Sequence, residues 1–326
     1  MKPRLRLLIP LLLVFLALLG AVIYAGWQGC QEEVAGTRDT TAGPARAEAV
    51  GVHLWVTADF GQRLIFAAEV GVNAGDSVLE VMKRHLEVET AYGGGFVQGI
   101  NGLASGYAAG RKQDWFYWVN GIMAPVGAAQ YRPSEGDVIW WDYHEWEHTL
   151  FIPAVVGAYP QPFKDAGAVI LYAPGFEEEA AAIKRGLTRL GVEGVSVRPL
   201  SEEGVAGRNA PAILLGPWLR LEADPLVGGL LKQEIRLGLY AKFAQGKIAL
   251  LRPDGTVARE LPSGGGVVLA VGSGAGDEEP LWLVTGADEA GVRRAARLLG
   301  SEPEALERSI GVAVAGSEAI PLPLLR

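Results

Sequence analysis

The chain has 326 residues, of which 49% are hydrophobic and 20% charged, and its formal net charge is −8 at pH 7. This length suffices for two modest domains, each with a core of its own. An acidic surface repels phosphate backbones, and the sequence has no basic cluster with interleaved aromatic residues, so nucleic acid is excluded as an expected partner.

The N-terminal segment predicts a membrane anchor. Lys2, Arg4 and Arg6 precede an uncharged apolar run over residues 7–25. A transmembrane helix needs about twenty such residues, and positive charges before the run keep its start in the cytoplasm. Residues 1–30 are therefore expected to form an uncleaved signal anchor that spans the cell membrane once, with the rest of the chain extracytoplasmic.

Cys30 is the only cysteine, so no intrachain disulfide is expected. It follows the apolar run at the place where a bacterial lipoprotein would be cut and lipidated. Gly29 suits that processing, but Trp27 and Gln28 stand where the usual signal has a leucine and a small residue. An unmodified thiol is the favoured interpretation, and lipidation of Cys30 is the alternative.

The first folded elements are expected after a flexible linker. Residues 31–49 contain almost no large apolar side chain, which is typical of a tether. Residues 52–57 alternate as a strand does, and residues 62–69 predict its antiparallel partner. Ser77 and Glu80 have capping-box spacing before an apolar helical stripe, which predicts the one convincing helix of this region.

Aromatic strand formers follow a glycine-rich segment. Residues 93–104 predict a short strand and turn, because no helix follows their glycines directly to make a phosphate loop. Residues 115–119 predict a strand, and Asn120-Gly121 predicts a tight hairpin turn behind it. Residues 138–143 predict another strand. Two strands, one helix and further short strands are the order of a β-grasp fold, in which a helix packs on a mixed sheet.

The pattern H-E-x-x-H stands at His144, Glu145 and His148, and on a helix it is the motif of a zinc protease. Strand formers on both sides and Pro153 behind them favour a strand. On a helix the two histidines lie about 6 Å apart and can share a zinc ion. On a strand they lie about 13 Å apart, too far for zinc bonds of about 2 Å. We therefore expect no metal site but a solvated or rim-facing strand end, with a zinc-dependent hydrolase using His144 and His148 as the less favoured alternative.

Four motifs in this order carry a family resemblance. They are "SVLEVMKRHLEVET", "GGFVQGINGLA", "DWFYWVNGIMAPVGAAQY" and "EGDVIWWDY". Residues 50–150 resemble the C-terminal domain of transcobalamin and intrinsic factor, and more closely the bacterial extracellular domains of uncharacterised function grouped with it. The matching positions are Gly95-Phe96-Val97, Ile100-Asn101-Gly102, residues 117–121, Gly127 with Tyr131, and Gly136-Asp137. The resemblance implies a β-grasp domain of the soluble-ligand-binding type.

The resemblance also implies a ligand site. In the animal members of the family this domain closes over one face of cobalamin, so cobalamin or a related corrinoid is a candidate ligand, and no cofactor is otherwise required. The residues that would contact the ligand are Trp115, Tyr117, Trp118, Met123, Ala124, Pro125, Val126 and Tyr131. Flat aromatic faces suit a large, partly apolar ring. The helical domain that forms the other half of the animal site is not evident here.

Residues 163–326 resemble no family that we recognise. Hydrophobic runs such as residues 168–172, 212–215, 267–271 and 281–285 alternate with helical patterns, which indicates an α/β domain with a mostly parallel sheet. The glycines at 272, 274 and 276 lead into a strand and therefore predict no dinucleotide loop. Asp288 has the position of a helix N-cap. No Ser/His/Asp set can be assembled, because all four histidines precede this half.

The sequence thus favours a membrane-tethered extracytoplasmic binding protein that is not an enzyme. Residues 50–153 are expected to bind a small molecule or a glycan, in connection with uptake, and residues 163–326 are expected to support or dock it. The alternative is a cell-surface protein-interaction or scaffold module, whose partner would be another protein.

Overall fold

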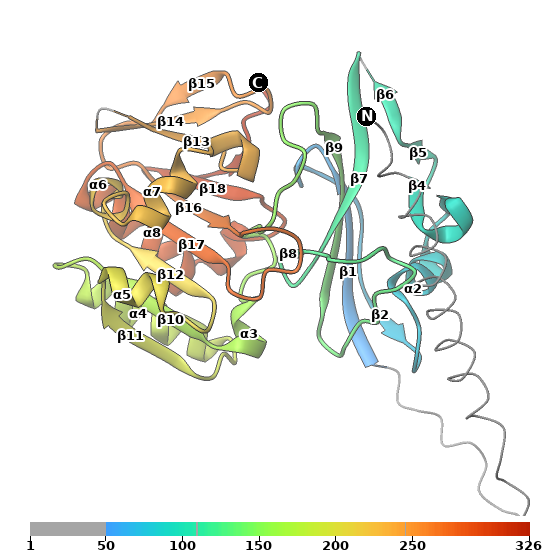
Figure 1. The fold of residues 1–326 in the computed structure, drawn as a ribbon, viewed down its shortest axis with the longest axis horizontal. Coiled ribbons are helices and arrows are strands. Elements are labelled where there is room, and N and C mark those ends of the chain that lie inside the picture. The colour runs from blue at the N-terminus through green and yellow to red at the C-terminus, as the bar shows by residue number, and fades with distance from the viewer. Residues whose placement is uncertain (1–49, 109, 245) are drawn as a thin grey trace, which may run out of the picture. The chain divides into compact units, whose positions relative to one another are not determined.

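A computed structural model describes residues 50–108, 110–244 and 246–326 (Figure 1). The predicted anchor at residues 1–30, the linker at residues 31–49 and Cys30 lie outside the described residues. Within the described ranges, no helix combines the length and the apolar character needed to cross a membrane. The described residues all belong to one compact unit.

The first sheet has six strands in the order β2-β1-β9-β7-β6, with β8 paired to β7. Its strands are β1 (Val50–Ala58), β2 (Arg63–Val72), β6 (Gly106–Ala108), β7 (Arg111–Val119), β8 (Ile122–Met123) and β9 (Val138–Glu145). β1 is antiparallel to β2 and parallel to β9, and β7 is antiparallel to β9. Asn120 and Gly121 have positive φ between β7 and β8, as the predicted hairpin turn requires.

One face of this sheet is covered by a helix and a small sheet. The covering elements are α2 (Val78–His85), β3 (Val88–Ala91), η1 (Tyr92–Gly94), β4 (Phe96–Ile100) and β5 (Leu103–Ala104). Figure 1 shows α2 on this face, beside the small sheet β3-β4-β5. Val78 and Met82 of α2 pack in one core with Leu54, Val56 and Trp141 of the sheet. The predicted mixed sheet with one helix on it is therefore present.

The capping box at the start of α2 is formed as predicted, and it leads to a testable expectation. The Ser77 hydroxyl accepts from the Glu80 N–H, and Glu80 accepts from the Ser77 N–H at 2.6 Å. Replacing Ser77 with alanine should lower the free energy of unfolding by about 1 kcal/mol in urea denaturation. Ser77→Thr keeps the hydroxyl and should retain most of the stability, and an equal loss in both variants would contradict the capping role.

The same cap should make this loss depend on pH. Hydrogen bonds from the Ser77 backbone N–H and hydroxyl hold the pKa of Glu80 below its usual range. The stabilisation is present above the pKa of Glu80 in the unfolded chain and is lost as the pH falls through its lower folded pKa. The difference between wild type and Ser77→Ala should therefore shrink in acid.

The second sheet has seven strands in the order β11-β10-β12-β17-β16-β18-β19. They are β10 (Ala168–Tyr172), β11 (Val195–Pro199), β12 (Ala212–Leu215), β16 (Gly266–Val271), β17 (Leu281–Gly286), β18 (Gly311–Ala315) and β19 (Glu318–Leu322). Strands β11, β10, β12 and β17 are parallel neighbours. The pairings β16 with β17, β16 with β18 and β18 with β19 are antiparallel. The expected mostly parallel sheet is thus wrong for half of the pairings.

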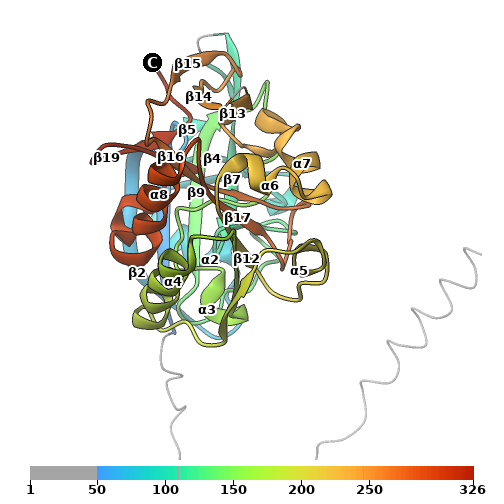
Figure 2. The same cartoon turned by 90° about the vertical axis from the view of Figure 1, so that its left-hand side faces the viewer.

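Helices cover both faces of the second sheet. Figure 2 shows α4 (Glu177–Arg189) and α8 (Glu289–Ser301) on one side of it, and α5 (Glu202–Ala206), α6 (Trp218–Leu221) and α7 (Pro225–Leu231) on the other. The small sheet β13-β14-β15 packs with the second group. The remaining elements are α3 (Phe163–Ala166), η2 (Glu234–Leu237), β13 (Ala241–Ala244), β14 (Lys247–Leu251), β15 (Val257–Glu260) and η3 (Pro303–Leu306).

The two large sheets share an apolar core. Trp118 and Trp140 of the first sheet and Phe60 from the β1–β2 turn belong to one buried cluster with Leu239 and Tyr240. The first sheet is therefore covered on both faces, by α2 on one and by the second half of the chain on the other. The division into separate domains between residues 153 and 163 stays a prediction.

Candidate functional site

The aromatic strand β7 points its side chains alternately into two cores. Trp118 is fully buried in the core shared by the two sheets, and its indole N–H donates to the Ile152 carbonyl at 2.8 Å. Trp115 is 5% exposed in the core under α2, and its N–H donates to the Leu103 carbonyl at 2.9 Å. The structure thus places two of the expected ligand-contacting residues inside the protein.

The hairpin after β7 is partly covered as well. Met123 is buried, and its carbonyl accepts from the Gly276 N–H at 2.8 Å. Ala124 is half-buried and donates through its N–H to the Tyr117 carbonyl at 3.2 Å. Pro125 is exposed, and Val126 is 40% exposed. Of the four expected hairpin contacts, only the last two face solvent freely.

The remaining expected residues, Tyr117 and Tyr131, lie at the edge of the α2 core. The Tyr117 ring stacks on the ring of Trp141 with centroids 4.5 Å apart and an angle of 9°. Its hydroxyl donates to the Val126 carbonyl. Burial, followed by the neighbouring Tyr131, raises the pKa of Tyr117. Both tyrosines are half-buried and pack against the α2 core.

Two exposed aromatic residues that the sequence analysis did not select adjoin this group. Tyr92 at the η1 turn is 91% exposed, and Phe96 at the start of β4 is 37% exposed. Their loop meets the hairpin, because a Cβ added at Gly127 would lie 3.2 Å from the Gly95 carbonyl oxygen. We call Tyr92, Phe96, Tyr117, Val126 and Tyr131 the aromatic surface. The sequence did contain a signal for Tyr92 and Phe96, because these two aromatic residues flank a run of three glycines, which is typical of an exposed turn.

The H-E-x-x-H segment is extended up to Glu145, as predicted, and β9 ends there. His144 is 2% exposed, whereas His148 is exposed beyond the strand. The expectation of a solvated or rim-facing strand end is therefore wrong for His144. The imidazole lies between the rings of Phe60 and Phe116, with centroids 4.5 and 4.6 Å away. Among the described residues, no three or more His, Cys, Asp or Glu side chains are grouped to hold a metal ion.

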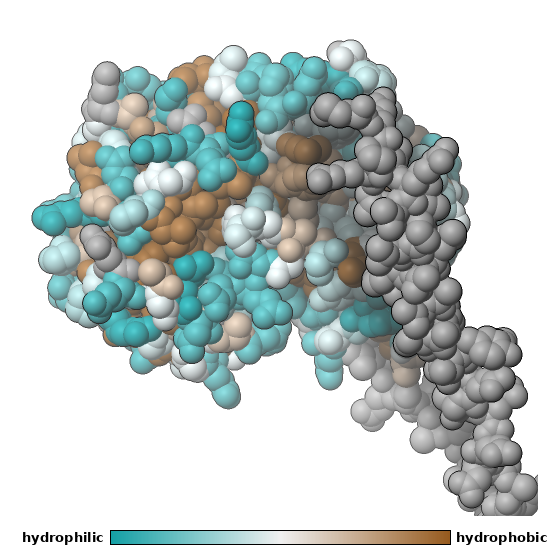
Figure 3. All heavy atoms as spheres, in the orientation of Figure 1, coloured by the Kyte–Doolittle hydropathy of each residue, from teal (hydrophilic) through white to brown (hydrophobic). Residues whose placement is uncertain are grey.

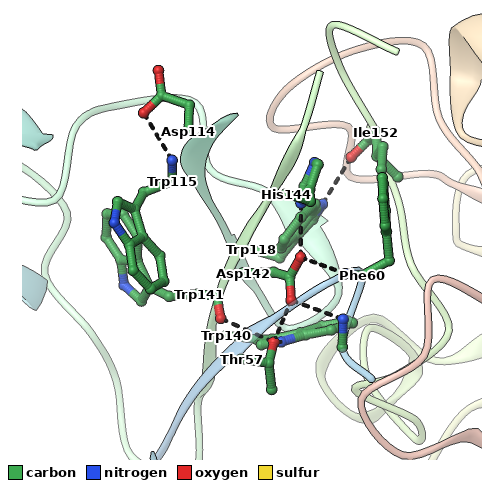
Figure 4. A network of polar contacts seen from close by, with 11 residues as sticks. Thr57, Phe60, Asp114, Trp115, Trp118, Trp140, Trp141, Asp142, His144 and Ile152 are labelled. Atoms are coloured by element: carbon green, nitrogen blue, oxygen red, sulfur yellow. Dashed lines mark hydrogen bonds and ion pairs between the residues drawn. The ribbon is translucent and has the colours of Figure 1, made fainter. Parts of the chain in front are cut away.

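A buried carboxylate explains the position of His144 (Figure 4). Asp142 is fully buried, and its Oδ1 accepts from Nδ1 of His144 at 2.8 Å and from the Phe60 N–H at 2.9 Å. Its Oδ2 accepts from the Thr57 hydroxyl at 2.6 Å and from the Gly61 N–H at 2.7 Å. The carboxylate therefore fixes the β1–β2 turn against β9. All of its hydrogen bonds go to groups of the protein, so the network stabilises the fold.

Four cavities of the described part of the chain lie away from the aromatic surface. One of about 1240 Å³ is an open groove between α4 and α8. One of about 230 Å³ lies beside the β1–β2 turn and is lined by charged groups that include Arg111 and Glu145. These two side chains pair with each other at 2.7 Å. The aromatic surface is a partly exposed face that a turn and a hairpin contribute to.

Comparison with protein families gives one match. A model described as a domain of unknown function (DUF4430) matches residues 75–145, which is less than a quarter of the chain. The matched segment runs from the start of α2 to the end of β9, and it contains the aromatic surface. A search of the curated proteins finds no match.

Two solved structures are similar to part of the chain. One is haptocorrin in complex with Cbi, at 17% sequence identity and a TM-score of 0.25, over 34% of this chain and 27% of that one. The other is a protein from Ruminococcus gnavus ATCC 29149 that is provisionally described as metal binding, at 18% identity and a TM-score of 0.24, over 29% of this chain and 97% of that one. The chain therefore spans about a quarter of the haptocorrin chain.

Proposed function

We propose that the protein is a membrane-tethered extracytoplasmic binding protein, not an enzyme, whose residues 50–153 form a β-grasp domain that binds a small molecule on the aromatic surface. The observation that carries the proposal is the exposure of Tyr92 and Phe96 in a loop that meets, through Gly95 and Gly127, the hairpin to which the Tyr117 hydroxyl is bonded. The parallel pairing of β1 with β9 under α2 supports the β-grasp assignment. The membrane tether rests on the sequence of residues 1–30.

Exposed aromatic rings favour a flat, partly apolar ligand. Burial of apolar surface contributes about 25 cal/mol per Å², and a stacked aromatic pair adds about 0.5–1.5 kcal/mol beyond its buried area. The Tyr117 ring is already held by Trp141 and by its hydroxyl bond to Val126, so it loses little side-chain entropy when a ligand covers it. This pre-organisation suits a rigid ring more than a flexible chain.

A corrinoid is the ligand that we propose first. The choice rests on the resemblance of residues 50–150 to the transcobalamin family and on the match of such a large, partly apolar ring to the aromatic surface. A glycan, which also stacks on aromatic rings, is the second ligand class for the same surface.

The purified full-length chain should be titrated with cobalamin while the corrinoid absorption and the tryptophan fluorescence are followed. Binding with a Kd in the micromolar range, about −8 kcal/mol, is expected. The double variant Tyr92→Ser/Phe96→Ser should weaken binding about tenfold or more, since it removes two exposed rings without touching a core. The matched control is Tyr107→Ser on β6, because Tyr107 is 73% exposed.

Three outcomes separate the alternatives. No spectral change at high micromolar cobalamin removes the corrinoid, and the titration is then repeated with a glycan panel. Equal weakening by the double variant and by Tyr107→Ser contradicts the aromatic surface as the site. Stoichiometric zinc that is lost on His148→Ala would favour the hydrolase alternative over a binding protein.

A further inference from the structure

A small cavity with features of a ligand site lies between residues 173 and 224, away from the aromatic surface. It has a volume of about 310 Å³ and lies beyond the carboxyl ends of β10 and β11, with α6 and the residues after it as its far wall. The lining residues used below are Ala173, Pro174, Ser201, Arg220 and Asp224. This volume is at the lower end of the roughly 300–1,000 Å³ of small-molecule sites.

The topology of the second sheet places the cavity where its connections diverge. β10 continues through α4 to β11 on one side, whereas β12 continues through α6 and α7 toward β16 on the other side. α4 packs on one face of the sheet, and α6 and α7 pack on the opposite face. The loops that follow the adjacent parallel strands β10 and β12 therefore diverge. In open α/β sheets, ligands typically bind in the crevice formed at such a point.

A glycine brings two strand ends close together beside Ala173, which lines the crevice. A Cβ added at Gly216, directly after β12, would lie 2.6 Å from the Cβ of Ala173, directly after β10. Gly216 also has a φ of +159°. The ends of β10 and β12 thus approach each other closely, while the chain segments beyond them diverge.

Three polar groups in the crevice have unused bonding capacity. The Arg220 side chain is exposed and, among the residues that the structure describes, has no ion-pair or hydrogen-bond partner. Asp224 is 8% exposed, and its Oδ1 caps α7 by accepting from the N–H groups of Leu226 and Val227. Its Oδ2 accepts no hydrogen bond within the described ranges. The Ser201 hydroxyl accepts from the Gly204 N–H, and its own proton is free to donate.

We propose that this crevice binds a small zwitterion, an α-amino acid or a close analogue. The guanidinium of Arg220 would bind the carboxylate, Oδ2 of Asp224 would bind the ammonium group, and the Ser201 hydroxyl would donate to the carboxylate. A purely anionic ligand is disfavoured, because Glu177 and Glu178, in the first turn of α4, follow Pro174 within four positions. Ala173, Pro174, Leu200 and Ala223 also line the crevice, so a short apolar side chain of the ligand has apolar neighbours. Figure 3 shows apolar side chains interspersed with polar ones on the surface of this half of the molecule.

The proposal is tested by calorimetric titration of the full-length chain with neutral L-amino acids up to roughly 10 mM, a range that detects affinities of about −4 kcal/mol. Alanine, valine and serine are suitable probes. Propionate lacks the ammonium group of alanine and ethylamine lacks its carboxylate, and each should bind at least tenfold more weakly than alanine. Tight binding of propionate alone, or no binding of any neutral amino acid, would overturn the proposal.

Two conservative variants locate the site. Arg220→Gln removes an exposed charge, and Asp224→Asn keeps an N-cap side chain while it removes the carboxylate, so both should fold with an unchanged Tm. Each should weaken amino-acid binding at least tenfold. The matched control Arg185→Gln, on the exposed side of α4, should leave binding unchanged. Binding that survives Arg220→Gln in a folded protein would place the ligand elsewhere and refute the assignment.

Discussion

Replacing Asp142 with asparagine should lower the free energy of unfolding by about 3–5 kcal/mol, the loss typical of a buried charged network that is left with an uncompensated group. The carboxylate is fully buried and accepts from four donors, namely the Thr57 hydroxyl, His144 Nδ1 and the N–H groups of Phe60 and Gly61. An asparagine offers one oxygen, and its NH₂ group must face donors on the other side. At least one buried N–H then loses its acceptor.

The turn that Asp142 holds makes the loss larger. Asp59 and Phe60 have φ of 59° and 60°, a conformation that residues other than glycine adopt at a cost. Without its acceptor, Phe60 loses the bond that keeps its ring against His144. We therefore expect a loss of near-ultraviolet circular dichroism from the shared core as well as a lower urea midpoint.

Asp59→Asn is the matched control for Asp142→Asn. The Asp59 side chain is 47% exposed and pairs with Arg63 at 3.0 Å, and surface pairs of this kind contribute about 0–1 kcal/mol. Asparagine also tolerates the positive φ at this position. The control should therefore shift the free energy of unfolding by less than 1 kcal/mol. Similar losses in the two variants would show that the buried network is not what stabilises the turn.

Local signals in the sequence predicted much of the first sheet. The capping box at Ser77, the Asn120-Gly121 turn and the strand through His144 depend on residues within a few positions of each other, and all three are present. The antiparallel half of the second sheet was missed because a hydrophobic run indicates burial and not direction. One signal was available: residues 272–280 are too few for a parallel crossover, which needs a dozen or more residues.

The candidate site was only partly predictable, because exposure depends on residues far away in the chain. Trp118 has the sequence context of a contact residue, but Leu239 and Tyr240, more than a hundred positions later, help to enclose it. His144 is buried for the same reason, since Phe60 comes from the β1–β2 turn and Phe116 from β7. Tyr92 and Phe96 are exposed because they lie at a turn, and the hydrophobic periodicity of the sequence does not show in which direction a turn points. Which side chains are buried is decided by the pairing of the strands and by the packing of the sheets and helices on one another, and both are tertiary properties.

The second large effect is expected where α8 meets the sheet through glycines. A Cβ added at Gly291 in the first turn of α8 would lie 2.1 Å from the Gly265 carbonyl oxygen, and one added at Gly266 would lie 2.2 Å from the Gly291 carbonyl oxygen. These neighbours are backbone atoms, so no side-chain rotation can relieve the overlap. The close approach also brings the Gly291 N–H to Asp288, the predicted N-cap, which accepts it at 2.8 Å.

Gly291→Ala should therefore lower the free energy of unfolding by about 3 kcal/mol or more, because α8 must move off β16 and β17 and separate Val292, Ala295 and Leu299 from the core. The matched control is Gly229→Ala in α7, where an added Cβ meets nothing within 4 Å. Alanine has the higher helix propensity, so the control should gain up to about 1 kcal/mol. Urea unfolding followed by tryptophan fluorescence measures both changes. A small loss for Gly291→Ala would mean that α8 can move away from the sheet without losing its packing. A loss of stability for Gly291→Ala together with a gain for Gly229→Ala would show that backbone contact, and not helix propensity, requires glycine at position 291.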